Sequence, residues 1–249
     1  MVTKSQIKNI RRLHLKKYRT ADGLFIAEGD KTVREFLAAG FEPELLVCVQ
    51  AWMDKNRATL EEAGVKAEVA APDVLVQLSG LQSAVSVMAV FHKPVWKINR
   101  ERVMSGWNLA LDGVSDPGNM GTLIRTADWF GVQYIFCSPG CVDSFNAKVV
   151  QSSMGSVARV EVHPVELKEL FEEYADLPLF GAQLRGEFPE RDSLPSAGFL
   201  LLGSESAGIS PSLERYIQTS VRIPRFGGAE SLNVAVAAAV LLAWIKIDA

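Results

Sequence analysis

The stretch Trp107-Asn-Leu-Ala-Leu-Asp-Gly-Val-Ser-Asp-Pro-Gly-Asn119-Met-Gly-Thr-Leu-Ile-Arg125 decides the fold class. Residues 107–111 are an apolar run typical of a buried strand, and the glycines and proline that follow predict a tight turn. A helix is predicted at residues 119–130, with Asn119 at its N-cap and Gly131 after its end. A strand, a glycine-rich turn and a helix in direct succession are the repeating unit of a parallel α/β sheet.

The same alternation continues toward the C-terminus. Strands are predicted at 134–138, 160–163, 179–183, 199–202 and 221–223, and helices at 145–153, 165–174, 211–217 and 231–247. This pattern favours a mostly parallel sheet that is covered by helices on both faces. Ligands bind such sheets beyond the carboxyl ends of the strands, so the loops that follow the strands form the candidate site.

The residues before Trp107 predict a smaller α/β unit. Helices are predicted at 5–19, 31–39, 53–63 and 72–77, and strands at 24–27, 45–49, 66–69 and 85–91. Residues 92–104 are charged and irregular, which is typical of a linker. We therefore expect two domains, residues 1–95 and residues 106–249.

The composition, with 48% hydrophobic and 22% charged residues, is that of an ordinary globular protein. No apolar run approaches the roughly 20 residues that a membrane-spanning helix needs, and the N-terminus does not resemble a signal peptide. The three cysteines, Cys48, Cys137 and Cys141, match neither a disulfide framework nor a zinc site. A reduced cytoplasmic protein with no membrane contact and no metal is expected.

Positive charge is concentrated at the N-terminus. The formal net charge of the chain is −3, yet residues 1–20 contain no acidic residue and the basic residues Lys4, Lys8, Arg11, Arg12, Lys16, Lys17 and Arg19. Such asymmetry indicates a local contact with a polyanion such as a nucleic acid, and Arg11, Arg12, Lys16 and Lys17 are the candidate residues for this contact. The alternative is a solvated basic helix without a partner.

Two further loops follow predicted strands. In Leu200-Leu-Leu-Gly203-Ser-Glu205-Ser-Ala-Gly208-Ile-Ser210, Glu205 could hold a ligand hydroxyl or cap a helix. In Ile223-Pro-Arg-Phe-Gly-Gly-Ala-Glu-Ser231-Leu-Asn233, Ser231 is the expected N-cap of the last helix. That helix is apolar all round, which indicates a core helix that could also form a subunit interface. Neither GxGxxG after the first strand nor GxxxxGK[ST] is present, so a Rossmann dehydrogenase or a P-loop enzyme is not expected.

At these loops the sequence resembles the SpoU/TrmH family of RNA 2′-O-ribose methyltransferases within the SPOUT superfamily. The first family motif matches Asp116-Pro-Gly-Asn119-Met-Gly121-Thr-Leu-Ile-Arg125. The second matches Leu202-Gly203-Ser-Glu205-Ser-Ala-Gly208-Ile-Ser210, and the third matches Ile223-Pro224 with Ser231-Leu232-Asn233-Val234. Phe25-Ile-Ala-Glu28-Gly29-Asp-Lys31-Thr-Val33 resembles the L30e-like substrate-binding domain that often precedes this catalytic domain.

The resemblance implies a fold, a reaction and partners. The expected fold contains a deep trefoil knot near the C-terminus, and the expected assembly is a homodimer formed through the last helix. The expected reaction transfers a methyl group from S-adenosylmethionine to a ribose 2′-hydroxyl of transfer RNA or 23S ribosomal RNA.

The resemblance also assigns roles to individual residues. The implied catalytic residues are Asn119, Arg125, Glu205, Ser231 and Asn233, and the implied cofactor-binding residues are Leu202, Gly203, Ile223, Leu232 and Asn233. Arg125 is the residue implied to activate the hydroxyl; because a guanidinium stays charged and has no acceptor, electrostatic stabilisation of the alkoxide is the expected role. Ala235 stands where the family often has a serine, so one hydrogen bond near the site is expected to be missing.

Two other functions fit the same residues. A SPOUT relative that methylates a base is the nearest enzymatic alternative, although the Asn119–Arg125 pair and the third motif favour ribose chemistry. A non-catalytic RNA-binding protein with the same fold is the alternative from another class, and product formation separates it from an enzyme.

Overall fold

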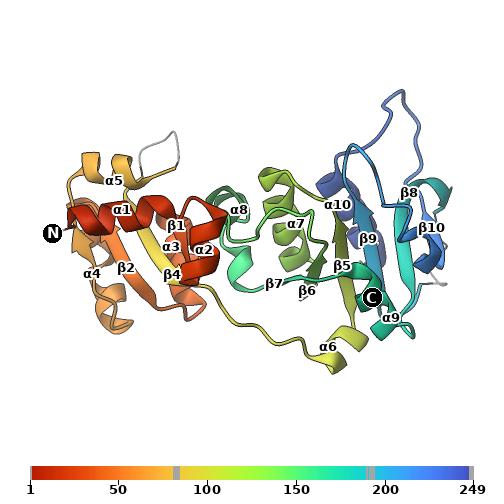
Figure 1. Cartoon of the computed structure of the whole chain (residues 1–249), viewed down its shortest axis with the longest axis horizontal. Helices are drawn as coiled ribbons and strands as arrows, with labels where there is room; N and C mark the ends of the chain where they lie inside the picture. The colour runs from red at the N-terminus through yellow and green to blue at the C-terminus, as the bar shows by residue number, and fades with distance from the viewer. Residues whose placement is uncertain (1, 81–84, 189, 191–193, 247–249) are drawn as a thin grey trace. The chain divides into compact units, whose positions relative to one another are not determined.

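The structure is a computed structural model that describes residues 2–80, 85–188, 190 and 194–246 (Figure 1). The chain separates into two compact units, Met1–Val95 with Asp143–Ala158, and Trp96–Val142 with Arg159–Ala249. Among the described residues, no helix combines the length and apolarity needed to cross a bilayer.

The first unit is built on a four-stranded mixed sheet of order β1-β4-β2-β3. Strand β4 runs antiparallel to both β1 and β2, whereas β2 and β3 are parallel. Its elements are α1 (Lys4–Arg12), α2 (Lys16–Asp22), β1 (Leu24–Glu28), α3 (Asp30–Ala38), β2 (Pro43–Cys48), α4 (Gln50–Glu62), β3 (Glu68–Val69), α5 (Pro72–Leu78), β4 (Val87–His92), α8 (Ala147–Ser152) and η1 (Ser156–Ala158).

The single helix expected at residues 5–19 is wrong, because the chain forms two helices there. Helix α1 begins with a capping box between Thr3 and Gln6 and ends at Arg12. Nη1 of Arg19 donates to the carbonyl oxygens of Leu13 and His14, at 2.9 and 3.0 Å. These carbonyl groups lie between the two helices, so the inward-turned guanidinium stabilises the break between α1 and α2.

A cluster of phenylalanine rings forms much of the core of the first unit. Phe25 of β1 contacts the rings of Phe36 and Phe91, with centroids 5.1 and 5.8 Å away. The ring of Phe145 lies closer still, at 4.6 Å from Phe25. Phe145 belongs to residues 143–158, which pack in the first unit. The domain range expected from the sequence, 106–249, places these residues in the second domain.

The second unit is built on a six-stranded sheet of order β10-β8-β9-β5-β6-β7 in which every pair is parallel. Its elements are α6 (Arg100–Met104), β5 (Trp107–Asp112), α7 (Pro117–Trp129), β6 (Tyr134–Cys137), β7 (Glu161–Pro164), α9 (Leu167–Glu173), β8 (Leu179–Glu187), β9 (Gly198–Gly203), η3 (Glu214–Tyr216), β10 (Thr219–Val221) and α10 (Val234–Lys246). The predicted parallel α/β sheet is thereby confirmed.

Both faces of this sheet are covered, as expected. On one face, Ala110 of β5 and Phe199 and Leu201 of β9 pack against α6, α9 and η3. The alternate strand residues point to the other face, where α10 packs against α7 and β9. The trefoil knot implied by the resemblance is a property of chain threading and stays a prediction.

Several element boundaries differ from those expected. Asp116, not Asn119, is the N-cap of α7, because its side chain accepts the backbone N–H of Asn119 at 2.8 Å. The helix expected at 211–217 is only the short 3₁₀ turn η3, and β8 runs on to Glu187. Helix α10 begins at Val234 rather than at Ser231, and Ile247, its expected last residue, lies outside the described residues.

Candidate functional site

The candidate site lies where the neighbouring strands β5 and β9 end. Asp112 closes β5 and is paired in register with Gly203, which closes β9. The carboxylate of Asp112 is buried and accepts the backbone N–H of Ser210 at 2.8 Å. This hydrogen bond connects the loop that follows β5 with the loop that follows β9.

The loop after β9 is a tight turn, and only glycine fits at the position where it begins, residue 203. The backbones of Ser204 and Gly208 exchange two hydrogen bonds, at 3.1 and 2.9 Å. A Cβ atom on Gly203 would lie 2.0 Å from the carbonyl carbon of Gly208, so any larger residue would open the turn. The turn presents Glu205 to solvent at its outer edge.

Three side chains from separate segments meet in one hydrogen-bond network. Nδ2 of Asn119, in the first turn of α7, donates to Oε1 of Glu205 at 3.0 Å. Nδ2 of Asn233 donates both to this carboxylate oxygen, at 2.6 Å, and to Oδ1 of Asn119, at 2.9 Å. The structure thus brings together three of the five predicted catalytic residues, one from each family motif.

Asn233 also caps helix α10. Its Oδ1 accepts the backbone N–H groups of Ala235 and Val236 at 3.0 and 3.3 Å. The prediction that Ser231 is the N-cap is therefore wrong, because the asparagine two residues later satisfies the first free N–H groups. The N–H of Ala235 has an acceptor, so the alanine at this position leaves the cap intact.

A cavity of about 870 Å³ adjoins the network. Four predicted cofactor residues, Leu202, Gly203, Ile223 and Leu232, line it, as do Glu205 and Ser231. Asn233, the fifth cofactor residue, does not line the cavity but follows Leu232 directly. The volume falls in the range of about 300–1,000 Å³ that is common for small-molecule sites.

The cavity wall is mixed in character, as a nucleoside-like ligand requires. The apolar side chains include those of Leu202, Val221, Ile223, Leu232 and Leu241. Polar residues of the loops after β9 and β10, among them Glu205 and Ser231, line it as well. Apolar walls suit a flat purine, and backbone groups can form hydrogen bonds with its edge.

Arg125 is not part of the network. It follows Asn119 by six residues on α7, which is a rise of about 9 Å and a rotation of about 240° around the helix axis. Its guanidinium is exposed and makes no hydrogen bond or ion pair with any residue that the structure describes. The charge is therefore available to a ligand from outside the chain.

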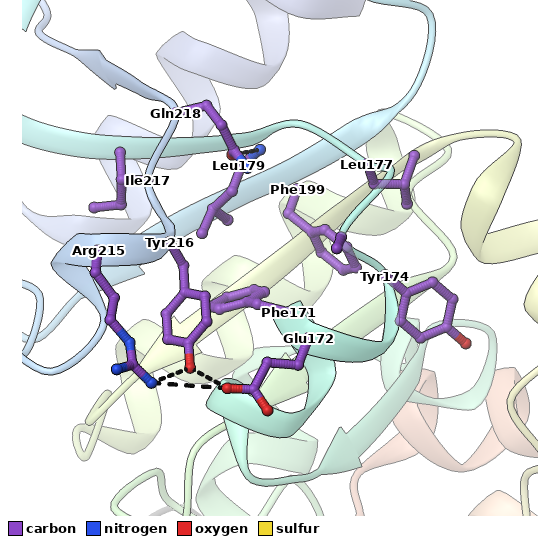
Figure 2. Close-up of a pocket in the computed structure, with 11 residues that line it drawn as sticks. Phe171, Glu172, Tyr174, Leu177, Leu179, Phe199, Arg215, Tyr216, Ile217 and Gln218 are labelled. Atoms are coloured by element: carbon purple, nitrogen blue, oxygen red, sulfur yellow. Dashed lines mark hydrogen bonds and ion pairs between the residues drawn. The ribbon is translucent and has the colours of Figure 1, made fainter.

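A second, smaller cavity of about 210 Å³ lies between α9 and η3 (Figure 2). The rings of Phe171, Tyr174 and Phe199 form much of its wall. At its edge the hydroxyl of Tyr216 donates to Glu172 at 2.5 Å and accepts from Arg215 at 2.6 Å. No residue of the three family motifs lines this cavity.

The predicted RNA-binding residues Arg11, Arg12, Lys16 and Lys17 are all exposed. Arg12 forms an ion pair with Asp22 at 2.9 Å, and Lys17 lies over the ring of Tyr18. Arg19 differs from its neighbours: it is 2% exposed and pairs with Asp143 at 2.8 Å. Its charge stabilises the first unit and is not available to RNA.

Cys141 lies beside the loop that follows β5. The hydrogen bond from Cys137 lowers the pKa of the Cys141 thiol to about 7, and the backbone N–H of Val114 acts in the same direction while burial opposes them. The pKa of Cys137 is raised well above its usual value by the same hydrogen bond and by burial. Cys141 is thus the reactive one of this pair.

Sequence reasoning missed part of the cavity wall. Residues 184 and 185 line the cavity because β8 continues beyond the predicted end at residue 183. The Leu184-Arg-Gly stretch gives no apolar alternation that would have extended the strand prediction. The hydrogen bond between Asp112 and Ser210 was likewise not predictable, since 98 residues separate the two in sequence.

Comparison with known proteins agrees with this geometry. The model of the SpoU rRNA Methylase family matches residues 106–243, and that of the MRM3-like substrate binding domain matches residues 4–89. The 23S rRNA (guanosine(2553)-2′-O)-methyltransferase RlmP of Bacillus subtilis is 33% identical over 246 residues, which cover 97% of this chain and 96% of the relative.

Solved structures extend the similarity to the whole chain. A TrmH-family RNA methyltransferase structure from Porphyromonas gingivalis has a TM-score of 0.86 and 35% identity, with full coverage of both chains. An AdoMet-bound rRNA methyltransferase from Sinorhizobium meliloti has a TM-score of 0.84 and 27% identity, covering 99% of this chain and 96% of that one.

Proposed function

Because the chain belongs to the SpoU rRNA methylase family, we propose that it methylates a ribose 2′-hydroxyl of ribosomal or transfer RNA with S-adenosylmethionine. The observation that carries the proposal is the network of Asn119, Glu205 and Asn233 at the edge of a cavity of nucleoside size. Among RNA classes, 23S ribosomal RNA is favoured, because RlmP, which its name describes as a 23S rRNA methyltransferase, aligns over 97% of this chain.

S-adenosylmethionine supplies an electrophilic methyl group on a sulfonium. The residues present fit this cofactor: Leu202, Ile223 and Leu232 provide apolar walls for the adenine, and the backbone near Gly203 provides hydrogen-bonding groups. The absence of a Cβ on Gly203 keeps the turn closed and the loop backbone at the cavity.

The network leaves defined groups for the substrate ribose. Both N–H groups of the Asn233 amide are used within the network, whereas one N–H of Asn119 remains. Oε2 of Glu205 has no partner among the described residues and can accept a ribose hydroxyl. Asn119, Glu205, Asn233 and Ser231 would thus orient the ribose for in-line attack, a contribution that is commonly worth several kcal/mol.

Arg125 supplies the positive charge that the network lacks. The attacking hydroxyl develops negative charge as it loses its proton, and the carboxylate of Glu205 alone would disfavour that charge. A guanidinium stays charged and offers only donors, so it cannot act as a base. We assign to Arg125 the stabilisation of the developing alkoxide, together with contact to an RNA phosphate.

The first domain, residues 1–95, is proposed to select the RNA, and residues 106–249 to carry the reaction. The exposed basic side chains on α1 and α2 support a phosphate-binding role for the first domain. A cytoplasmic location follows from a ribosomal RNA substrate and agrees with three free cysteines.

The active form is proposed to be a homodimer that associates through α10. Val236 and Val240, spaced by one helical turn, are 48% and 39% exposed on this helix. An apolar stripe on an otherwise buried helix favours contact with a second apolar surface. An isologous dimer would cover this stripe with the same stripe of the partner.

The test is incubation of the purified protein with methyl-labelled S-adenosylmethionine and separate pools of unmodified 23S ribosomal RNA and transfer RNA. Nucleoside mass spectrometry is expected to detect a 2′-O-methylnucleoside from one pool. Glu205→Ala should abolish the product, whereas Glu169→Ala, at an exposed position on α9, should not. A methylated base would instead identify a base methyltransferase, and RNA binding without product would identify a non-catalytic binding protein.

A further inference from the structure

The segment between β10 and α10 carries an exposed aromatic ring at the edge of the large cavity. Phe226 is 97% exposed, the highest value among the large hydrophobic residues of the described chain. It lines the same cavity as Glu205 and Ser231. Contact with water over a whole phenyl ring is unfavourable, so a position at the mouth of a binding cavity indicates a partner that covers the ring.

Two hydrogen bonds hold the conformation of the segment. The backbone N–H of Arg222 donates to the carbonyl of Glu187 at 3.1 Å, which ties the beginning of the segment to the end of β8. Nη1 of Arg225 donates to the carbonyl of Ala229 at 3.3 Å, which closes the segment around Phe226. The ring is therefore presented by a loop with defined contacts and not by a free end.

Two arginines precede this ring in the same segment. Arg222 and Arg225 are both exposed, and the Arg222 side chain makes no hydrogen bond or ion pair within the described ranges. Both residues line the cavity. Glu230 is the acidic residue of the same segment, and Arg185 of β8 is already paired with Glu214.

An exposed aromatic ring with guanidinium groups on the same cavity lining is a combination that binds unstacked nucleotides. Bases of single-stranded RNA stack on aromatic side chains, and arginines contact the phosphates on either side. A ribose held at the Asn119–Glu205–Asn233 network must place its base nearby, outside a helical stack. Phe226 offers a flat apolar surface on the lining of the same cavity.

We propose that Phe226 is the stacking platform for the base of the target nucleotide, and that Arg222 and Arg225 bind the phosphates that flank it. This inference rests on the proposed function, because it assumes that the ribose of the same nucleotide occupies the network. Stacking on a phenyl ring makes no hydrogen bond to a base edge. Phe226 therefore contributes affinity for an unstacked base and does not distinguish guanine from the other bases.

The ring is tested with Phe226→Tyr, which keeps an aromatic face, and Phe226→Leu, which keeps only apolar character. Binding of an unmodified 23S ribosomal RNA transcript is measured by fluorescence anisotropy, and binding of S-adenosylmethionine by calorimetry. Phe226→Leu is expected to weaken RNA binding by about 5- to 150-fold, the range for loss of one stacked base. It should change the Kd of S-adenosylmethionine less than twofold, and Phe226→Tyr should bind RNA like the unaltered protein.

A matched control is Trp129→Leu, since Trp129 is 84% exposed at the end of α7 but does not line the cavity. This variant should leave RNA affinity unchanged. If the Phe226→Leu variant binds RNA normally, the assignment of Phe226 as the stacking platform is wrong. If it weakens S-adenosylmethionine binding as strongly as RNA binding, the ring covers the cofactor and the proposal is also wrong.

The arginines are tested through the salt dependence of RNA binding. Arg222→Gln and Arg225→Gln should each reduce the slope of log Kd against log salt concentration by about 0.7, the value for one phosphate of a single strand. Lys168→Gln, an exposed residue on α9, is the matched control. An unchanged slope in both arginine variants would remove the phosphate contacts from the proposal.

These readouts do not depend on turnover. Suppose that the unaltered protein forms no 2′-O-methylnucleoside, but the Phe226→Leu variant binds RNA more weakly than the unaltered protein. The proposed function then fails, while the RNA-binding surface stands. If the unaltered protein is active and the Phe226 and arginine variants are all normal in RNA binding, this inference fails while the function stands.

Discussion

Glu205 accepts hydrogen bonds from the side-chain amides of Asn119 and Asn233 through one carboxylate oxygen. These two donors determine how the carboxylate is oriented, and the other oxygen remains for a ligand. Asn233 also binds the N-terminal backbone of α10 through its amide oxygen. A single asparagine thus links the position of a helix to the orientation of the Asn119–Glu205–Asn233 network.

At the same scale, Arg125→Ala is expected to lower kcat about 100-fold or more, which is the usual effect of removing one group that stabilises a developing oxyanion. The Kd of S-adenosylmethionine should change only a few-fold, because Arg125 does not line the cavity. Single-turnover methylation of RNA with the labelled cofactor measures the first effect, and calorimetry the second. Near-normal turnover would exclude Arg125 from the reaction.

Cys141 is expected to be the thiol that reacts first with iodoacetamide. Its pKa, lowered to about 7, means that the thiolate predominates above this pH, so the alkylation rate should rise with pH and reach half its maximum near pH 7. Cys48 and Cys137, whose pKa values are raised, should remain unmodified at neutral pH. Peptide mass spectrometry across pH 5–10 (about the range that brackets free thiols) measures this, and loss of the fast phase in Cys141→Ser is the control.

At the scale of elements, the basic residues of α1 and α2 fall into an exposed group and a buried one. Arg11, Arg12, Lys16 and Lys17 face solvent, whereas Arg19 is buried against Asp143. Helix α2 is short, ends at Asp22 and is capped by Gly23, which has a left-handed conformation with φ of +64°. The buried arginine therefore positions the basic surface without contributing its own charge to it.

Substitution of Arg11, Arg12, Lys16 and Lys17 by glutamine should weaken RNA binding and reduce its salt dependence. The slope of log Kd against log salt concentration should fall by about 0.7 to 0.9 for each phosphate contact that is lost. Anisotropy titrations of an RNA transcript at several salt concentrations provide the measurement. A variant with the same substitutions at the exposed residues Arg34, Lys55, Arg57 and Lys66 is the matched control. An equal loss in both variants would indicate a general charge effect and no specific surface.

At the scale of the whole molecule, residues 143–158 are the main departure from a simple two-domain order. They follow β6 in the chain, yet Asp143 pairs with the buried Arg19 and Phe145 packs on Phe25 in the first unit. The first unit is consequently complete only when the chain has passed through part of the second.

Phe145→Ala is expected to destabilise the first unit by about 3–5 kcal/mol, because it removes a buried ring and leaves a cavity. Urea unfolding followed by tryptophan fluorescence should show this as an earlier transition, with Trp52 as the reporter within that unit. Phe226→Ala removes an exposed ring and should change the unfolding free energy by no more than about 0.5 kcal/mol. Equal effects of the two substitutions would contradict the packing of Phe145.

The proposed dimer gives the last prediction. Val236→Lys combined with Val240→Lys should produce a monomer, because charged side chains on the apolar stripe of α10 disfavour its burial. Sedimentation velocity compares this variant with the unaltered protein and with Val76→Lys, an exposed position in the first unit. A monomeric unaltered protein, or an unchanged dimer in the double variant, would contradict association through α10.

The sequence alone was sufficient for the class of fold and for part of the cavity lining. Apolar runs alternating with helical periods predict parallel strands and covering helices, because these periods reflect local backbone geometry. Leu202, Gly203, Ile223 and Leu232 were identified by motif and line the cavity. Loops after neighbouring parallel strands meet at one edge of a sheet, so motifs far apart in sequence could be expected to converge.

Only the tertiary structure decided which groups became partners. In the sequence, Arg19 cannot be distinguished from the other basic residues of its helix. In the structure it pairs with Asp143, which is 124 positions away. The hydrogen bonds that join Asn119 to Glu205 and Asp112 to Ser210 are contacts of the same long-range kind. Local periodicity carries no information about such pairs, because burial and hydrogen bonding between distant segments arise only when the chain has folded.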